Sequence, residues 1–192
     1  MTRAATQVLH SPDGVGYWTR QAAIIVSATV FVAICAHITI PLPFTPVPLT
    51  LQNFAVLLVG VTLGSRRGFA TLALYLMEGI AGLPVFNPTG PGGLAQILGP
   101  TGGFLMVYPL VAAFAGFVAE RGARSFARTA AGCLLAEFVL FAGGIGWLAV
   151  LTHSASLALH YGFYWFVFAE VIKVMMAAGL STGWRLAGKS QA

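Results

Sequence analysis

The stretch AAIIVSATVFVAICAHITI, residues 22–40, holds 19 consecutive residues without an acidic side chain, a lysine or an arginine. A helix needs about 20 mostly apolar residues to cross the hydrocarbon core of a bilayer, which is about 30 Å thick. Pro41 and Pro43 follow directly, and proline ends a helix because it lacks a backbone donor and clashes with the preceding turn. This stretch is therefore predicted to be a membrane-spanning helix.

The rest of the chain has the composition of a protein surrounded by lipid. Its 192 residues are 58% hydrophobic and 8% charged, and the mean hydropathy is +0.86. Soluble domains are about 25% charged, and a small soluble domain leaves much of its surface exposed. A soluble fold of this length could not hide so much apolar surface, so we expect an integral membrane protein with one domain.

Five further apolar runs complete a predicted all-α fold of six transmembrane helices. They cover, in order, residues 48–63, 68–83, 104–119, 129–151 and 161–186. The second and third of the six helices are short, so either could be tilted or partly re-entrant. We place the membrane domain at 22–187, after an N-terminal segment, 1–21, and before a C-terminal tail, 188–192.

The basic residues predict the orientation of these helices. Nine of the ten lie in the two terminal segments, in the loops after the second and fourth helices, or at the C-terminal end of the sixth helix: Arg3, Arg20, Arg66, Arg67, Arg121, Arg124, Arg128, Arg185 and Lys189. The other three loops, 41–47, 84–103 and 152–160, hold none. Because cytoplasmic loops are enriched in Lys and Arg, both termini are predicted to be cytoplasmic. This asymmetry accounts for the net charge of +5, and no nucleic-acid-binding pattern accompanies it.

Small residues recur at four-residue spacing within the apolar runs. Gly60, Gly64 and Gly68 form one series, and Ala112 and Gly116 form another. Small residues at this spacing let membrane helices approach one another closely. We expect them to mark helix packing within the chain, although an exposed series could also contact a partner.

The first outer loop is rich in proline. Residues 40–52 read IPLPFTPVPLTLQ and contain four prolines, which should make the connection stiff and extended. The loop delivers Thr50 and Gln52 to the outer end of the second helix, where we expect them to contact a ligand.

The second long outer loop mixes glycine, proline and apolar residues. Residues 82–104 read GLPVFNPTGPGGLAQILGPTGGF. Asn87 and Gln96 offer amide donors and acceptors, Phe86 offers apolar surface, and glycines such as Gly102 let the backbone approach a ligand. Loops of this length in compact domains are usually functional or disordered. The loop sequences alone are equally compatible with simple covers over the end of the bundle.

Two charged residues interrupt the last apolar run. Glu170 and Lys173 are three residues apart, which places them on one face of a helix. A charge near the bilayer centre costs about 2.5–3.5 kcal/mol on insertion scales, so such residues indicate a functional site unless they only neutralise each other. In our interpretation Lys173 donates to an anionic ligand group, and Glu170 accepts from ligand N–H groups or holds Lys173. Tyr164 and Trp165 would add aromatic walls to the pocket.

The remaining titratable residues do not indicate a functional site. We expect a structural or interface role for Glu78 and Glu137. The cysteines and histidines match no disulfide or metal-site pattern, so we expect no metal site and no cofactor.

Three blocks in the outer loops resemble the BioY family of biotin transporters: TPVPLTLQ (45–52), GLPVF (82–86) and LGPTGGF (98–104). The resemblance runs from about Ile24 to Ala187. It implies a substrate-binding component of an energy-coupling-factor transporter in the plasma membrane of a prokaryote. Such a component takes biotin from outside and works with a transmembrane coupling protein and a pair of cytoplasmic ATPases.

The resemblance also implies roles for particular residues. The family's acidic-x-x-Lys motif falls on Glu170 and Lys173, with Glu where the family more often has Asp. Its loop amide falls on Asn87. Its first helix docks the coupling protein through a face of small residues, represented here by a weaker version formed by Ala28, Thr29, Ala33 and Ala36.

Other functions fit the sequence less well. The main alternative is a self-contained secondary transporter of a small anionic, vitamin-like solute, but such transporters often contain internal repeats and none is evident. A purely structural membrane subunit would not need Glu170 and Lys173. We expect no enzyme activity, and because no Walker motif is present, any coupling to ATP must come from another chain.

Overall fold

The computed structural model describes residues 12–121 and 125–189, and the side chains of 15–121 and 125–183. Six helices of at least 12 residues form most of this part: α2 Pro12–His37, α3 Gln52–Leu63, α4 Ser65–Ile80, α6 Gly102–Glu120, α7 Phe126–Thr152 and α9 Val167–Lys189. Each overlaps one of the six predicted runs. The predicted terminal segments reach beyond the described residues at 1–11 and 190–192, and Arg3 and Arg124 also lie outside them.

The helix lengths bear on how the chain crosses the membrane. Within the described residues, α2, α6 and α7 are each long and apolar enough to cross alone, and residues 155–164 and 167–183 together form a bent fourth candidate. The 12 residues of α3 and the 16 of α4 span about 18 and 24 Å, less than the roughly 30 Å core. The membrane protein is therefore multi-pass, and the count of six complete spans stays a prediction.

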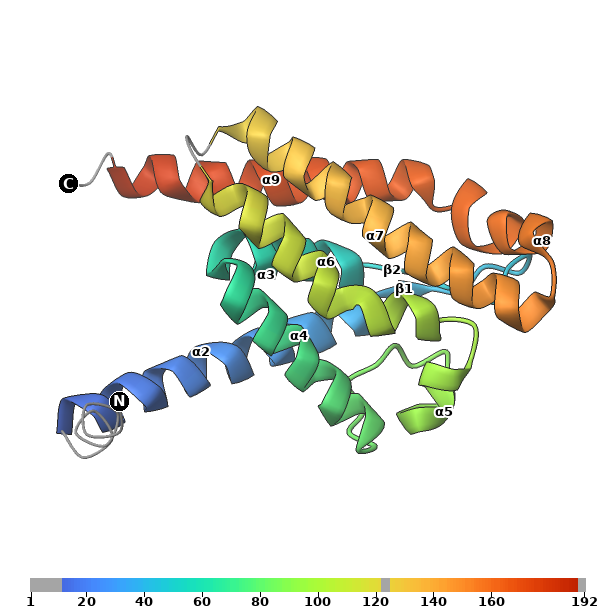
Figure 1. Ribbon diagram of the computed structural model, residues 1–192, viewed down its shortest axis with the longest axis horizontal. Coiled ribbons are helices and arrows are strands. Elements are labelled where there is room, and N and C mark those ends of the chain that lie inside the picture. Colours follow the sequence, from blue (N-terminus) through green and yellow to red (C-terminus); the bar gives the residue numbers. More distant parts are fainter. Residues whose placement is uncertain (1–11, 122–124, 190–192) are drawn as a thin grey trace, which may run out of the picture.

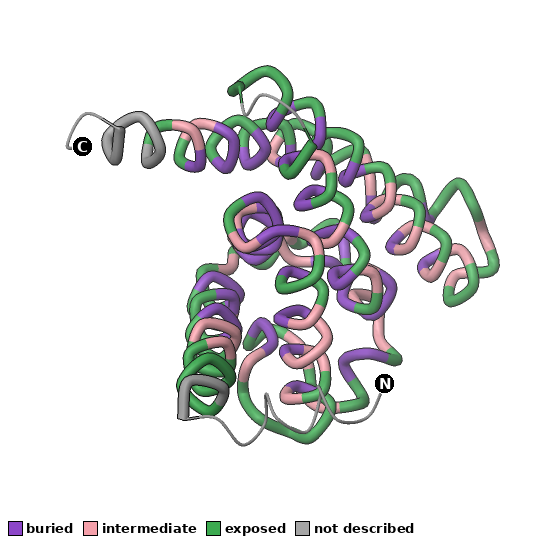
Figure 2. The backbone as a smooth tube through the Cα atoms, turned by 60° about the vertical axis from the view of Figure 1, so that its left-hand side comes forward, coloured by how far each residue is buried: buried purple, intermediate pink, exposed green. Residues whose placement is uncertain are grey.

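The helices form a bundle around α6, which packs against α3, α4 and α7 (Figure 1). The last helix, α9, lies against α3 and α7, while α2 contacts α3 and α4. Buried positions follow the sides of the helices that face one another (Figure 2). Large apolar side chains remain on the outside, with Phe138 73% and Phe168 76% exposed. Such exposure is typical of a surface that faces lipid, where apolar side chains carry no solvation cost.

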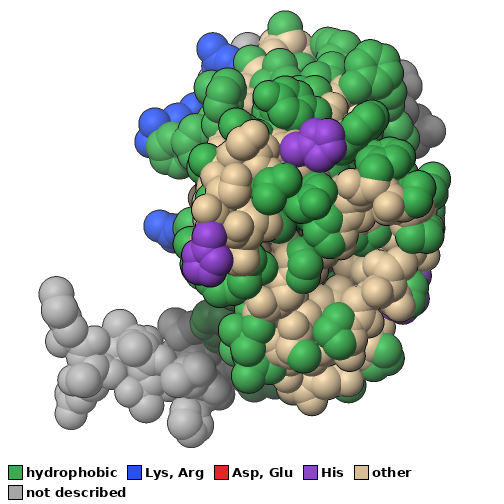
Figure 3. Space-filling model, turned by 90° about the vertical axis from the view of Figure 1, so that its right-hand side faces the viewer, with side chains coloured by type: hydrophobic (Ala, Val, Ile, Leu, Met, Phe, Trp, Pro, Cys, Tyr) green, Lys and Arg blue, Asp and Glu red, His purple; other side chains and the backbone are tan. Residues whose placement is uncertain are grey.

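The two ends of the bundle differ in charge. Arg66 and Arg67 lie in the first turn of α4, Arg121 follows α6, and Arg128 lies in the first turn of α7. These helix ends lie together at the left of Figure 1. At the opposite end, the described surface shows apolar groups, uncharged polar groups and histidines, with Lys and Arg only at one edge (Figure 3).

The proline-rich first loop forms a short β-hairpin rather than a simple extended connection. β1, Thr39–Ile40, pairs with β2, Leu49–Thr50, in an antiparallel register. The Leu51 amide donates to the Ile38 carbonyl at 3.0 Å and continues the pairing. The second long loop also contains structure that the sequence did not predict, a short helix α5 at Gly93–Leu98.

The sixth predicted helix, 161–186, is wrong as a single element. Residues Ala155–Leu159 form α8, and His160–Tyr164 form a π-helical turn, η1, before α9 begins at Val167. The axis bends by 42° at this break. A long-range contact supports the break, because the Thr45 hydroxyl donates to the Tyr161 carbonyl at 2.8 Å. An interrupted helix at membrane depth needs such a partner for its freed backbone groups.

Replacing Thr45 with valine should therefore destabilise the fold. The buried hydroxyl donates to the Tyr161 carbonyl and accepts from the Val47 amide at 3.2 Å, so its removal deletes two hydrogen bonds to the backbone. We expect a loss of about 1–3 kcal/mol, measured as a lower Tm in detergent. Thr45→Ser keeps the hydroxyl and is the matched control. Equal melting of the two variants would contradict a role for this contact.

Candidate functional site

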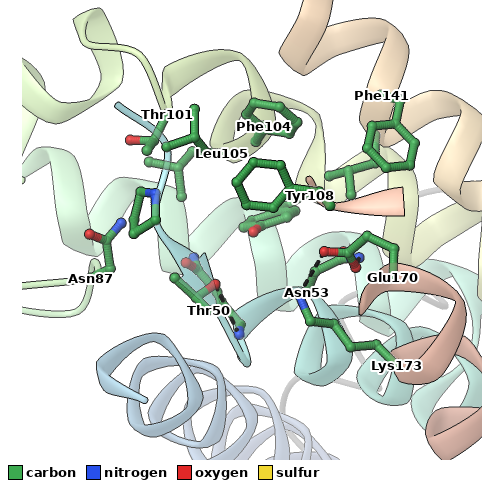
Figure 4. A pocket seen from close by; sticks show the side chains of 15 residues that line it. Thr50, Asn53, Asn87, Thr101, Phe104, Leu105, Tyr108, Phe141, Glu170 and Lys173 are labelled. Carbon is green, nitrogen blue, oxygen red and sulfur yellow. Dashed lines mark hydrogen bonds and ion pairs between the residues drawn. The ribbon is translucent and has the colours of Figure 1, made fainter. Parts of the chain in front are cut away.

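A pocket lies among α3, α6, α7 and α9, at the end of the bundle that carries the β-hairpin and α5 (Figure 4). The hairpin contributes Pro48 and Thr50 to its lining, and the second long loop contributes Asn87 and Thr101. Both uncharged loops therefore reach the same cavity, although Thr50 and Asn87 are 37 positions apart in the sequence.

One side of the pocket is aromatic. Phe104 and Tyr108 lie one turn apart on α6, Phe141 comes from α7, and Phe166 lies at the break before α9. Figure 4 shows the rings of Phe104, Tyr108 and Phe141 on the side of the cavity opposite the polar groups. Apolar walls with a few placed polar groups are typical of small-molecule sites.

The other side is a buried polar network. Lys173 Nζ donates to Glu170 Oε1 at 2.6 Å, and Asn53 Nδ2 donates to Glu170 Oε2 at the same distance. Asn53 Nδ2 also donates to Glu137 Oε1 at 2.7 Å. The four residues are between 3% and 7% exposed. Buried charges are costly unless they are paired and hydrogen-bonded, and the contacts between Glu170 and its two partners meet that condition.

Three helices bring this network together. Glu170 and Lys173 lie on one face of α9, Asn53 lies in the first turn of α3, and Glu137 lies on α7. Because α9 packs against both α3 and α7, these faces converge beneath the aromatic wall. The structure places the i, i+3 pair of the last helix as an ion pair in the lining of the pocket.

A second set of hydrogen bonds holds the long loop over the pocket. Gln52 Nε2 donates to the Tyr75 hydroxyl at 2.9 Å, and that hydroxyl donates to the Val85 carbonyl at 2.7 Å. Within the loop, Gln96 Nε2 donates to the Asn87 carbonyl at 3.3 Å. These bonds fix the backbone on either side of Asn87, whose side chain faces the cavity.

The pocket is narrow as it stands. Its cavity volume is about 50 Å³. Sites for small molecules usually measure about 300–1,000 Å³. A ligand of that class would therefore widen the cavity.

The profile described as "BioY family" matches residues 2–189. The chain belongs to the BioY family.

Among BioY relatives, a protein of Thermotoga maritima named "Biotin transporter BioY" is 37% identical, with 78% of this chain and 86% of the relative covered. A protein of Rhizobium etli with the same name is 35% identical, covering 79% of this chain and 84% of the relative. A solved structure described as the S-component for biotin from an ECF-type ABC transporter has the same fold. It shares 23% identity and a TM-score of 0.80, with 88% of this chain and 93% of that chain covered.

Five of the residues predicted to contact ligand in this BioY protein line the pocket: Thr50, Gln52, Asn87, Glu170 and Lys173. Three others lie just behind the lining. Phe86 is buried with its ring 5.5 Å from that of Tyr75, Gln96 is buried within the loop, and Gly102 lies against the Ile97 carbonyl where α6 begins.

Tyr164 and Trp165 do not line the pocket. They are 63% and 46% exposed. The centroid of the Trp165 ring lies 4.3 Å from that of Phe44 in the hairpin loop, with the two ring planes tilted by 43°. The prediction assumed a continuous helix through this region. The bend before α9 turns these two side chains outward and places Phe166 in the lining instead.

Asn53 and the aromatic residues of α6 and α7 line the pocket but were not among the predicted site residues. Asn53 directly follows Gln52 and is an uncharged polar residue at the start of an apolar run. Phe104 is the last residue of the LGPTGGF block, so its position in that block was the available signal.

The small residues proposed on the first helix are mostly covered by the chain itself. Thr29 and Ala36 are 1% and 0% exposed, Ala28 is 9% exposed, and only Ala33 is half-buried. The Thr29 hydroxyl donates to Glu78 Oε1 at 3.2 Å and joins α2 to α4. Glu78 and Ala33 lie along a groove between these helices that also exposes Val26, Val30 and Ile34.

One further sequence pattern is structural. GLSTG, residues 179–183, has the G-x-S-x-G spacing of a hydrolase nucleophile. Ser181 instead lies within α9, buried, and its hydroxyl donates to the Ala178 carbonyl at 3.1 Å. That motif needs a sharp strand-to-helix turn to expose the serine, which agrees with a BioY protein being a transport component and not an enzyme.

Proposed function

We propose that this chain is the substrate-binding subunit of an energy-coupling-factor transporter and that its ligand is biotin. The observation that carries the proposal is the buried Lys173–Glu170 pair, which faces an aromatic pocket beneath two uncharged loops. Membership of the BioY family and the names of its relatives support biotin as the ligand.

The chemistry of biotin complements the pocket. Its carboxylate suits the Lys173 ammonium, because hydrogen bonds between charged groups are the strong ones. Its ureido ring carries two N–H donors and a carbonyl acceptor, which suit the Asn87 amide on the other side of the cavity from Lys173 (Figure 4), while Glu170 holds Lys173. Its compact apolar bicycle suits the walls formed by Phe104 and Phe141.

We further propose that the pocket opens outward and that the arginine-rich end is cytoplasmic. The hairpin and the long loop at the mouth contain no Lys or Arg, while Arg66, Arg67 and Arg121 lie at the opposite end of the bundle. This asymmetry supports the positive-inside orientation. A coupling protein and a pair of ATPases would act as partners from the membrane and the cytoplasm, since the chain carries no Walker motif.

Isothermal titration of the purified, detergent-solubilised protein with biotin tests the ligand. We expect tight one-to-one binding, because the pocket supplies a partner for each polar group of biotin. A folded protein that binds no biotin would contradict the proposal. Proteoliposomes that contain this chain alone and accumulate biotin without ATPases would instead favour the self-contained secondary transporter.

A further inference from the structure

The Asn53 amide joins two buried carboxyl groups. Its nitrogen donates to Glu170 Oε2 at 2.6 Å and to Glu137 Oε1 at 2.7 Å, so both amide hydrogens are used. Glu137 and Glu170 come from different helices, α7 and α9, and Asn53 is the residue that both of them contact.

The charges around this bridge do not balance if both carboxyl groups are ionised. Among the described residues, the groups that face Glu137 are Glu170 and Lys173 on α9, Tyr108 on α6 and Cys133 on its own helix. Lys173 is the one cation in this set, and it pairs with Glu170 at 2.6 Å. A second carboxylate would remain as an uncompensated negative charge in the interior, which is strongly unfavourable.

Two atoms of the bridge also lack partners. Within the described part of the chain, Asn53 Oδ1 and Glu137 Oε2 are both buried and accept no hydrogen bond. They belong to the two side chains already joined by the 2.7 Å bond. An ionised carboxylate can only accept, whereas a protonated one also has an O–H donor. A proton on Glu137 Oε2 turns one of these two atoms into a donor and removes the unbalanced charge.

We propose that Glu137 is held as the neutral acid and acts as a positioning residue for Asn53, leaving Glu170 as the one ionised carboxylate of the pocket. The consequence of a neutral Glu137 for ligand binding rests on the proposed function. With Glu137 neutral, Glu170 and Lys173 balance each other and a ligand carboxylate can approach. With both acids ionised, the empty pocket would carry a net negative charge that repels an anionic ligand.

Infrared spectroscopy of the ligand-free protein at neutral pH tests the protonation state. We expect a C=O stretching band from a protonated carboxylic acid that disappears in Glu137→Gln and remains in Glu78→Gln, which changes a glutamate outside this network. A parent protein without such a band overturns the proposal with no variant needed. A band lost only in Glu170→Gln also overturns it, because Glu170 would then hold the proton. If Glu137→Gln does not fold, Glu137→Asp assigns the band by shifting it.

Biotin binding tests the positioning role. Glutamine mimics the neutral acid because it keeps an oxygen for the Asn53 amide and carries no charge, whereas alanine removes the anchor. We expect Glu137→Ala to bind at least about tenfold more weakly than the parent and Glu137→Gln to recover most of that loss. Equal weakening in both variants would overturn the positioning role. A parent that binds no biotin but shows the Glu137 band would refute the proposed function and leave the neutral acid intact.

Discussion

Replacing Lys173 with methionine is expected to weaken biotin binding by at least about tenfold and up to about 150-fold, or about 1.5–3 kcal/mol. Methionine keeps an unbranched apolar stem and removes the ammonium. The variant loses the proposed contact with the biotin carboxylate and leaves the buried Glu170 without its cation. Breaking a buried ion pair by removing one partner is strongly destabilising, so titration must be accompanied by a measurement of Tm.

Arg67→Met is the matched control for this prediction. Arg67 is exposed on the first turn of α4, at the opposite end of the bundle from the pocket mouth, and its replacement removes the same charge. We expect it to bind biotin as the parent does. If Lys173→Met, folded and melting near the parent, also bound biotin with parental affinity, the ligand would have to lie elsewhere in the chain.

The sequence predicted the central helices closely. Runs 104–119 and 129–151 correspond to α6, Gly102–Glu120, and α7, Phe126–Thr152. Charged residues and glycine–proline segments bound these runs, so the change in composition coincides with the helix ends. The first helix shows the limit of this reasoning. α2 begins ten residues before the predicted start. A helix can continue into polar residues outside the bilayer, whereas apolar composition identifies only the part of a helix that lies within the lipid.

The bend before α9 could not be predicted from local sequence. No proline lies between residues 161 and 186, and the break instead involves a hydrogen bond between Thr45 and Tyr161, which are 116 residues apart. Contacts of this range depend on the whole fold. The wrong placement of Tyr164 and Trp165 follows from the same cause, since their direction was inferred from a continuous helix.

The site residues that could be predicted from the sequence are those whose side chains are rare in membrane-spanning helices. Glu170 and Lys173 stand out because a charge in an apolar run is expensive. Asn53 does not, because an uncharged amide at a helix start is common. Its importance arises only when α7 and α9 place two carboxyl groups on either side of it.

Replacing Gly116 with alanine is expected to destabilise the fold by about 3 kcal/mol, near the upper end for overpacking. A Cβ on Gly116 of α6 would lie 2.5 Å from the Ser65 amide nitrogen, 2.6 Å from the Gly64 carbonyl carbon and 2.7 Å from the Gly60 carbonyl oxygen. All three are backbone atoms of the α3–α4 turn, which cannot rotate away as a side chain can. The small-residue spacing in the sequence thus corresponds to a close crossing of helices.

Gly146→Ala separates this packing effect from the general effect of adding a methyl group to a helix. Gly146 also lies inside a helix, α7, but a Cβ there would meet no atom within 4 Å. Alanine favours helix over glycine by about 1 kcal/mol in water, so we expect Gly146→Ala to melt at or slightly above the parent Tm. Gly116→Ala should melt well below it, measured by thermal unfolding in detergent. Equal Tm values for the two variants would mean that α6 can move away from the α3–α4 turn at little cost. Helix packing at that crossing would then not be what holds the aromatic wall of α6 over the polar network of α3 and α9.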